Sequence, residues 1–135
     1  MSMRLFDTAR GEVVPFQPGS SVSMYVCGIT PYDATHLGHA FTYLTFDLVI
    51  RRLEDLGHEV HMVRNITDVD DSILGKAREI GVPFMDLAAD EMDNFHDDLA
   101  ALDLRPALAE PTATGSIRAM LDLIGRLEAG GHTYT

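Results

Sequence analysis

The sequence predicts an α/β fold in which helices flank a parallel sheet. Two apolar runs rich in β-branched residues, at 22–29 and 59–66, lie on either side of an amphipathic helical pattern at 39–56. A strand, a helix and a strand within about 45 residues have the length of one crossover connection. Because such a connection joins parallel strands, we expect a parallel sheet with helices packed on it.

Before this unit, the chain predicts a small antiparallel ribbon. Two short apolar runs between Leu5 and Phe16 flank Asp7–Gly11, whose residues favour a loop longer than two residues. Pro18–Ser21 then interrupts the pattern. The run Val22–Ile29 carries no charge, which is typical of a strand buried on both faces of a parallel sheet.

The segment from His39 to Leu56 predicts the first long helix. Its apolar residues recur at helical spacing, and Gly57 stands where a helix commonly ends. The residues expected on its apolar face are Phe41, Leu44, Phe46, Leu48, Val49, Leu53 and Leu56. Glu59–Ile66 follows as the second strand.

Three further helices are expected after this strand. Thr67 is a candidate cap for a helix from Asp68 to about Ile80. A longer helix at 84–104 has the apolar positions Leu87, Met92, Phe95, Leu99 and Leu102. Its acidic residues predict a solvated face: Asp86, Asp90, Glu91, Asp93, Asp97 and Asp98. A last helix ends at Gly130–Gly131 and has the stripe Ile117, Met120, Leu121, Ile124 and Leu127.

Composition and charge restrict the function. The chain has 135 residues, 46% of them hydrophobic and 23% charged, which is typical of one globular domain. With 10 Lys and Arg against 21 Asp and Glu, its net charge of −11 excludes a protein that binds nucleic acid through an overall basic surface. The single cysteine, and the lack of a signal-peptide pattern or a bilayer-length apolar stretch, predict a cytoplasmic protein without a membrane span.

The residues after the first parallel strand predict a nucleotide site. Ligands of open α/β sheets bind beyond the carboxyl ends of the strands, and that position holds Cys27–His39. Gly38 at a helix start lets a ligand approach backbone N–H groups that favour phosphate. His36 and His39 would share one face of the first turn and donate hydrogen bonds to a phosphate that gathers charge. The alternative for either histidine alone is structural, with one capping the loop and the other packing beneath it.

Two stretches carry a family resemblance. Met24–His39 (MYVCGITPYDATHLGH) and Asn65–Asp71 (NITDVDD) resemble the cysteine-activating branch of the class I adenylate-forming ligases, and His36–His39 is similar to their HIGH motif. This branch contains the cysteinyl-tRNA synthetases and the mycothiol-pathway ligases, which join cysteine to the amino sugar glucosaminyl-inositol. Pro31–Thr35 and Ala40 resemble the mycothiol ligases more, and the acidic charge also disfavours tRNA as the acceptor.

The resemblance implies a Rossmann-like class I aminoacyl-tRNA synthetase catalytic domain. Residues 1–135 would form its N-terminal half, with about 105–135 resembling the start of an inserted domain. The implied reaction converts cysteine and ATP, with its magnesium, to cysteinyl adenylate and transfers the cysteinyl group to the amine of glucosaminyl-inositol. His36 and His39 would be catalytic and would bind ATP together with Gly38. The alternatives are a cysteinyl-tRNA synthetase fragment and a nucleotide-binding relic without turnover.

The cysteine substrate is expected to meet Cys27, Thr30 and Thr67. The resemblance makes Cys27 the first ligand of a zinc ion that binds the substrate sulfur, whereas a lone cysteine in a strand is otherwise a small buried hydrophobe. Thr30 is alternatively a turn former and Thr67 a helix cap. The later zinc ligands and the second family signature, KMSKS, have no counterpart in this sequence. The C-terminal half of such an enzyme, or a second chain, is expected to supply them.

Other polar residues have structural interpretations. Asp68, Asp70 and Asp71 could ligate magnesium, but we prefer acids that complement the dipole at a helix start. Asp33 would either bind the substrate ammonium or cap the following turn. No chemistry is assigned to His58, His61, His96 and His132.

Overall fold

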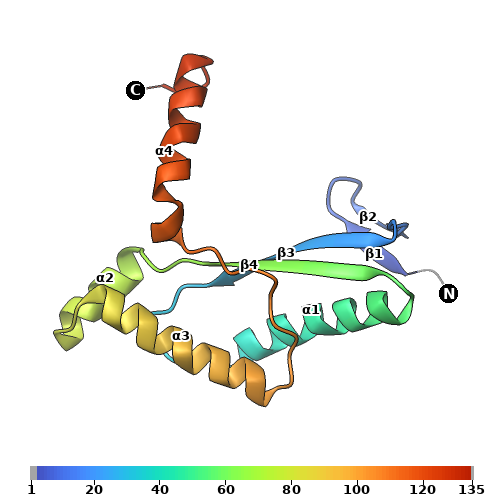
Figure 1. The fold of residues 1–135 in the computed structure, drawn as a ribbon, viewed down its shortest axis with the longest axis horizontal. Helices are drawn as coiled ribbons and strands as arrows, with labels where there is room; N and C mark the ends of the chain where they lie inside the picture. The colour runs from blue at the N-terminus through green and yellow to red at the C-terminus, as the bar shows by residue number, and fades with distance from the viewer. Residues whose placement is uncertain (1–2, 135) are drawn as a thin grey trace.

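The computed structural model describes residues 3–134 and confirms the parallel α/β arrangement. β3 (Ser21–Ile29) and β4 (Glu59–Ile66) pair in parallel. Backbone hydrogen bonds from Arg64 and Ile66 continue the sheet onto residues 108–112, which lie beside β4 (Figure 1). The extended segments are therefore ordered β3, β4 and 108–112.

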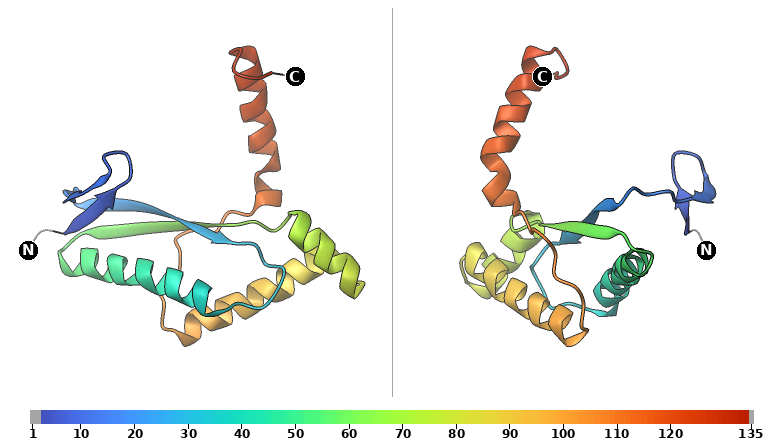
Figure 2. Two further views of the ribbon diagram at one scale, coloured as in Figure 1. Left: turned by 180° about the vertical axis from the view of Figure 1, so that it is seen from behind. Right: turned by 45° about the vertical axis from the view of Figure 1, so that its right-hand side comes forward.

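Four helices complete the fold. α1 (Leu37–Asp55) connects β3 to β4, and α2 (Asp71–Ile80) and α3 (Phe84–Ala101) connect β4 to residues 108–112. Figures 1 and 2 show α1 and α3 on one face of the sheet, α2 beyond the carboxyl ends of the strands and against α3, and α4 (Ala113–Ala129) projecting away from the sheet. None of the described helices is long and apolar enough to cross a membrane.

The predicted N-terminal ribbon is confirmed. β1 (Arg4–Asp7) and β2 (Glu12–Pro15) pair in antiparallel orientation. The Asp7 carboxylate accepts the N–H groups of Ala9 and Arg10, and Gly11 takes a positive φ of 70°. The loop is therefore held by its own aspartate and glycine.

The prediction that β3 is buried on both faces is wrong. Val22, Val26 and Ile29 are buried, whereas Tyr25 is 66% exposed and Cys27 is exposed. α1 and α3 cover one face of the sheet, and the other face of β3 is open among the described residues (Figure 2). An uncharged run therefore predicted the strand correctly, but not what covers its second face.

α1 is a helix as predicted, but the buried face differs from the predicted one. It buries Tyr43, Asp47, Ile50 and Leu53, so only the last of these belongs to the expected apolar face. Phe41, which was expected on that face, is 75% exposed. Because apolar residues occur on most sides of α1, their spacing alone does not select one face.

The buried carboxylate of α1, Asp47, is paired both within the helix and with the segment that follows α3. Asp47 Oδ2 accepts a hydrogen bond from Arg51 Nε at 2.5 Å, and its Oδ1 accepts the Arg105 N–H at 3.0 Å. A buried carboxylate without partners would be costly. These bonds allow Asp47 to face inward, and they tie α1 to the chain leading into the third extended segment.

The core lies between the sheet and the helices α1 and α3. Phe95 of α3 is 1% exposed and packs edge-on against Tyr43, with ring centroids 5.2 Å apart. Arg64 of β4 is also buried, and its guanidinium carbon lies 5.0 Å from each of these ring centroids. Arg64 Nε donates to Glu110 Oε1 at 2.8 Å, and Glu110 Oε2 lies 2.8 Å from His96 Nε2. A paired buried charge therefore joins β4, α3 and the segment before α4.

The same contacts change the proton affinities of two residues. Burial raises the pKa of Tyr43 to about 12, although the positive charge of Arg64 opposes this shift. Burial alone would raise the pKa of Glu110, but hydrogen bonds from Arg64 and His96 outweigh it and lower that pKa below its ordinary value. At neutral pH, Tyr43 is therefore a neutral phenol and Glu110 a carboxylate.

The prediction that Thr67 caps α2 is wrong. Asp70, not Thr67, is the N-cap, and its Oδ1 accepts the Ile73 N–H at 2.9 Å. The Thr67 N–H instead donates to the Ile29 carbonyl at 2.9 Å, so strand pairing continues past the predicted cap. Asp71 lies in the first turn, where a negative charge complements the helix dipole.

α4 is joined to the body of the fold at its first turn. Asp68 is buried outside α2, and its carboxylate accepts both the N–H and the hydroxyl of Thr114. Thr112 caps α4 by accepting the Gly115 N–H at 3.0 Å. No residue of α4 is buried, so its predicted apolar stripe is exposed.

α3 ends earlier than predicted. It stops at Ala101, and the chain leaves the helix through Asp103, which has a positive φ of 53°. Leu102, expected on the apolar face, lies outside the helix and is 40% exposed. The other four predicted apolar positions of this helix are buried as expected.

Candidate functional site

The carboxyl ends of β3 and β4 meet at an irregularity built around Gly28. The register between the strands shifts between Val26 and Ile29. A Cβ on Gly28 would lie 1.5 Å from the Asn65 carbonyl oxygen, so a larger residue would have to move the backbone. Gly28 therefore sets how closely the two strands approach one another next to Cys27.

The Asn65 side chain connects three parts of this edge. Its Oδ1 accepts the Gly28 N–H at 2.9 Å and the Tyr25 hydroxyl at 2.8 Å, and its Nδ2 donates to Thr67 Oγ1 at 3.3 Å. Asn65 was not predicted as a site residue. The signal available was a polar residue near the carboxyl end of a strand, where ligands of α/β sheets bind.

Three residues predicted to meet a cysteine substrate lie along this edge. The hydrogen bond from Thr67 to Ile29 places Thr67 beside the start of the loop that carries Thr30. Both threonines are half-buried. Cys27 lies on β3 and is exposed, so the alternative of a buried small hydrophobe is wrong.

The first turn of α1 is built from the two predicted histidines. His36 is the N-cap, and its Nδ1 accepts the Gly38 N–H at 3.0 Å. The His36 N–H in turn donates to His39 Nδ1 at 3.3 Å, which completes a capping box. Because both Nδ1 atoms accept backbone N–H groups, each neutral ring carries its proton on Nε2. The capping role expected of one histidine is confirmed for His36, and it leaves the Nε2–H groups as donors.

The two imidazoles lie on one face of the turn, as predicted. Their centroids are 4.0 Å apart and their planes differ by 19°. Burial, and to a smaller extent the neighbouring His36, lowers the pKa of His39 below its ordinary value of 6.5. His39 is therefore neutral at pH 7 and presents a donor without a formal charge.

Gly38 is required by the histidine cap itself. A Cβ at this position would lie 2.7 Å from Cε1 and 2.9 Å from Nδ1 of His36. Any side chain here would push the His36 ring away from the N–H group that it accepts. Close approach of a ligand to the backbone at Gly38 stays a prediction, and the packing of the ring supplies an independent reason for glycine.

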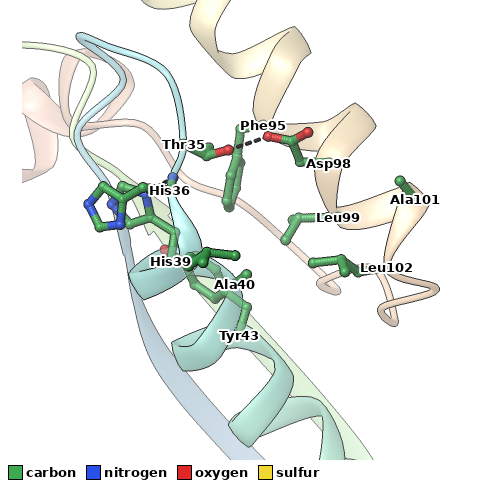
Figure 3. Close-up of a pocket in the computed structure, with 11 residues that line it drawn as sticks. Thr35, His36, His39, Ala40, Tyr43, Phe95, Asp98, Leu99, Ala101 and Leu102 are labelled. Atoms are coloured by element: carbon green, nitrogen blue, oxygen red, sulfur yellow. Dashed lines mark hydrogen bonds between the residues drawn. The ribbon is translucent and has the colours of Figure 1, made fainter.

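A pocket of about 430 Å³ lies beside this turn, between α1 and α3 (Figure 3). Its wall is largely apolar and includes Ala40, Tyr43, Phe95, Leu99 and Leu102. The Thr35 hydroxyl donates to the Asp98 carboxylate, so one acid expected on a solvated face instead binds the loop before α1. Figure 3 shows the rings of His36 and His39 turned away from α3. His36 and His39 also line the pocket, whereas Cys27, Thr30 and Thr67 do not. The predicted phosphate-binding and cysteine-binding residues therefore do not all converge on it.

The described residues do not form a complete zinc site. Within residues 3–134, no group of three or more His, Cys, Asp or Glu side chains is arranged to hold a metal ion. Because a protein zinc site uses at least three protein ligands, Cys27 alone does not fit the ion. Asp68 and Asp70 are engaged by Thr114 and Ile73, which supports the structural interpretation of the acidic cluster.

Other polar residues of the sequence analysis have local partners. Asp33 Oδ1 accepts the Ala34 N–H at 2.9 Å, which supports its interpretation as a turn residue. His58 Nδ1 lies 2.8 Å from the Gly19 carbonyl oxygen. These contacts hold loops in place and add no group to the edge between β3 and β4.

Comparison with known proteins connects this geometry to a family. The family model described as "tRNA synthetases class I (C) catalytic domain" matches residues 13–135. Over 132 residues the chain is 49% identical to a protein of Nocardia farcinica and 52% identical to one of Mycobacterium tuberculosis, both named L-cysteine:1D-myo-inositol 2-amino-2-deoxy-alpha-D-glucopyranoside ligase. Each match covers 98% of this chain and 32% of the relative, so the chain spans about a third of the length of these relatives.

A solved structure is similar in fold. The Mycobacterium tuberculosis methionyl-tRNA synthetase in complex with methionyl-adenylate matches with a TM-score of 0.61 and 23% identity, over 64% of this chain and 17% of that chain. This similarity supports the class I fold predicted from the sequence. The family match extends over most of the chain and includes both strand ends and the paired histidines. The chain therefore belongs to the family of class I (C) tRNA synthetase catalytic domains.

Proposed function

We propose that this chain is the ATP-binding and cysteine-binding part of an AMP-forming ligase, and that the complete enzyme joins cysteine to the amine of glucosaminyl-inositol. The observation that carries the proposal is the pair of stacked imidazoles at the start of α1, whose Nδ1 atoms accept backbone N–H groups. The names of the relatives that are about half identical to the chain support the substrates.

In the first step, a carboxylate oxygen of cysteine attacks the α-phosphorus of ATP. The bond between that phosphorus and the bridging oxygen breaks, pyrophosphate leaves with magnesium, and cysteinyl adenylate remains. His36 and His39 direct their Nε2–H groups at the phosphate oxygens, and these hydrogen bonds strengthen as charge accumulates.

In the second step, the amine of the amino sugar attacks the carbonyl carbon of the adenylate. An amide bond forms, AMP leaves, and the amine loses a proton. The name of the relatives favours this acceptor, and the net charge of −11 gives tRNA no overall basic surface. The alternative acceptor, tRNA, would instead be esterified by the same adenylate.

The first step is tested by cysteine-dependent exchange of labelled pyrophosphate into ATP by the purified chain. If the chain alone activates cysteine, exchange will require cysteine, and we expect His39→Ala to reduce it about 100-fold or more, because one transition-state donor is lost. The matched control is His132→Ala, which removes an imidazole outside the site and leaves exchange unchanged.

Equilibrium binding of ATP separates the outcomes. Binding without exchange would mean that residues outside this chain are required for activation, whereas absence of ATP binding would contradict the proposal. For the acceptor, AMP release from cysteine and ATP is compared with glucosaminyl-inositol and with tRNA. Release stimulated only by tRNA would favour the alternative.

A further inference from the structure

The loop between β3 and α1 is held near both of its ends. Pro31, near its start, is fully buried, whereas the three residues after it are exposed. At the other end, the Thr35 hydroxyl donates to the Asp98 carboxylate of α3. In the described part of the chain, this is the only hydrogen bond that joins residues 31–35 to another helix or strand. The end of the loop next to the histidines is therefore tied to the rest of the fold through Asp98.

Asp98 is a fixed point for this loop. It lies on α3 between two core residues, Phe95, which is 1% exposed, and Leu99, which is also buried. The Asp98 side chain itself is exposed, and Figure 3 shows its carboxylate directed at Thr35. The packing of α3 in the core therefore determines where the carboxylate accepts the Thr35 hydroxyl.

The position of Thr35 affects the histidines through one peptide unit. The Thr35 carbonyl and the His36 N–H belong to the same planar unit and move together. That N–H donates to His39 Nδ1 at 3.3 Å, which leaves the proton of the neutral His39 ring on Nε2. Figure 3 shows both imidazole rings turned away from α3, so Asp98 acts on them only through Thr35.

We propose that Asp98 is a positioning residue that, through Thr35, keeps the Nε2–H groups of His36 and His39 directed at the phosphates of the nucleotide. This inference rests on the proposed function, in which these two groups bind phosphate. A hydrogen bond weakens steeply when its donor is misaligned, so loss of the Thr35 contact weakens phosphate binding although every donor is still present. The negative charge of Asp98 by itself has the opposite effect, because it repels phosphate.

The test compares two probes, α,β-methylene ATP and adenosine, which lacks the phosphates. Their binding to the purified chain is measured by calorimetry. In Asp98→Ala, the preference for the ATP analogue is expected to fall about 5- to 10-fold, because hydrogen bonds to a charged group are weakened and not lost. A preference that stayed the same, or that rose as removal of a negative charge alone predicts, would overturn the proposal.

Further variants separate the hydrogen bond from the charge. Asp98→Asn keeps an oxygen that accepts the Thr35 hydroxyl and should retain the preference, whereas Thr35→Val removes the hydroxyl and should reproduce the loss. Asp97→Ala removes the same charge from the neighbouring exposed position of α3 and should not lower the preference. Combining Thr35→Val with Asp98→Ala should add less than about a twofold change, because both remove one contact. A full additional loss would show that the two residues act independently and would overturn the proposal.

A measurement without nucleotide distinguishes this inference from the proposed function. Exchange of the His36 amide proton with water, followed by NMR, should be about 5-fold faster in Asp98→Ala and unchanged in Asp98→Asn. Exchange in the middle of α3 is the reference, because a merely structural role of Asp98 would accelerate it there as well. Unchanged His36 exchange in Asp98→Ala would overturn the proposal. If the native chain does not prefer the ATP analogue over adenosine, the proposed function is wrong, while His36 exchange still decides whether Asp98 holds the histidine cap.

Discussion

α3 and α4 have similar lengths and similar amphipathic patterns, but α3 is packed in the core and α4 is exposed. They are amphipathic helices of 18 and 17 residues. α3 packs into the core and buries Leu87, Ala88, Met92, Phe95 and Leu99, whereas α4 buries no residue and projects from the body (Figure 1). The difference shows that helical spacing predicts a helix and its apolar stripe, while burial depends on which other elements reach that stripe.

Truncating one apolar residue in each helix gives the largest expected contrast. Phe95→Ala should lower the free energy of unfolding by about 3–5 kcal/mol, because it empties a site in the core. Ile124→Ala in α4 should change it by less than about 0.5 kcal/mol, because the residue is already exposed. Both values come from urea denaturation followed by circular dichroism. Equal losses would mean that α4 is packed in solution and would remove the contrast.

The charge network that anchors α3 should give the next largest effect. Glu110→Ala leaves Arg64 buried without its carboxylate and is expected to cost about 2–3 kcal/mol in urea denaturation. Glu128→Ala, on the exposed end of α4, is the matched control and should be neutral. Because the pKa of Glu110 is lowered in the folded state, its contribution is present at neutral pH and lost as the pH falls through that value. An unchanged stability in Glu110→Ala would contradict the pairing.

The contact between α4 and the body should give a smaller and local effect. Asp68→Ala removes the acceptor of the Thr114 N–H and hydroxyl, and is expected to destabilise the first turn of α4 by about 1 kcal/mol. Amide hydrogen exchange should accelerate there and not in α3. Thr114→Val removes only the hydroxyl contact and should have the weaker effect of the two. Uniform acceleration across both helices would show that Asp68 supports the whole fold instead.

The same contrast explains how much of the fold the sequence predicted. The strand, helix and strand unit followed from periodicity, because a period of two or of 3.6 residues is a local property. The buried face of α1 did not follow, because Phe41 and Tyr43 are both aromatic and only the position of α3 selects between them. The burial of Arg64 was also invisible, since its partner Glu110 is 46 residues away along the chain.

For the candidate site, the sequence predicted residue types better than their contacts. His36 and His39 were predicted to share one face of the first turn of α1, and the structure confirms that they do. The cap at Asp70 was missed because Thr67 is an equally good capping residue, and only strand pairing with Ile29 excludes it. Asn65 was missed because its partners Tyr25 and Gly28 lie on another strand, and a single sequence does not show which strands are neighbours.

The smallest predicted effect concerns the N-terminal caps of α1 and α4. The stability of the first turn of α1 should depend on pH, whereas that of α4 should not. α1 is capped by imidazole nitrogens, whereas α4 is capped by the hydroxyl of Thr112, which does not titrate in the physiological range. The pKa of His39 is lowered by burial and then by His36, so the unfolded chain binds more protons as the pH falls below 6.5. The contribution of neutral His39 is therefore present above pH 6.5 and lost as the pH falls through its folded-state pKa.

Protonation at Nδ1 would remove the acceptor of the His36 N–H, and the loss of such a cap costs at most about 1 kcal/mol. Amide exchange, corrected for the intrinsic effect of pH, should therefore accelerate in the first turn of α1 between about pH 7.5 and about pH 5. It should stay constant in the first turn of α4. His39→Gln supplies a carbonyl acceptor that does not titrate, so in that variant the part of the pH dependence that comes from the contact between the His36 N–H and residue 39 should disappear. If the pH dependence were unchanged in His39→Gln, His39 would not be the titrating group, and another contact of α1 would cause its pH sensitivity.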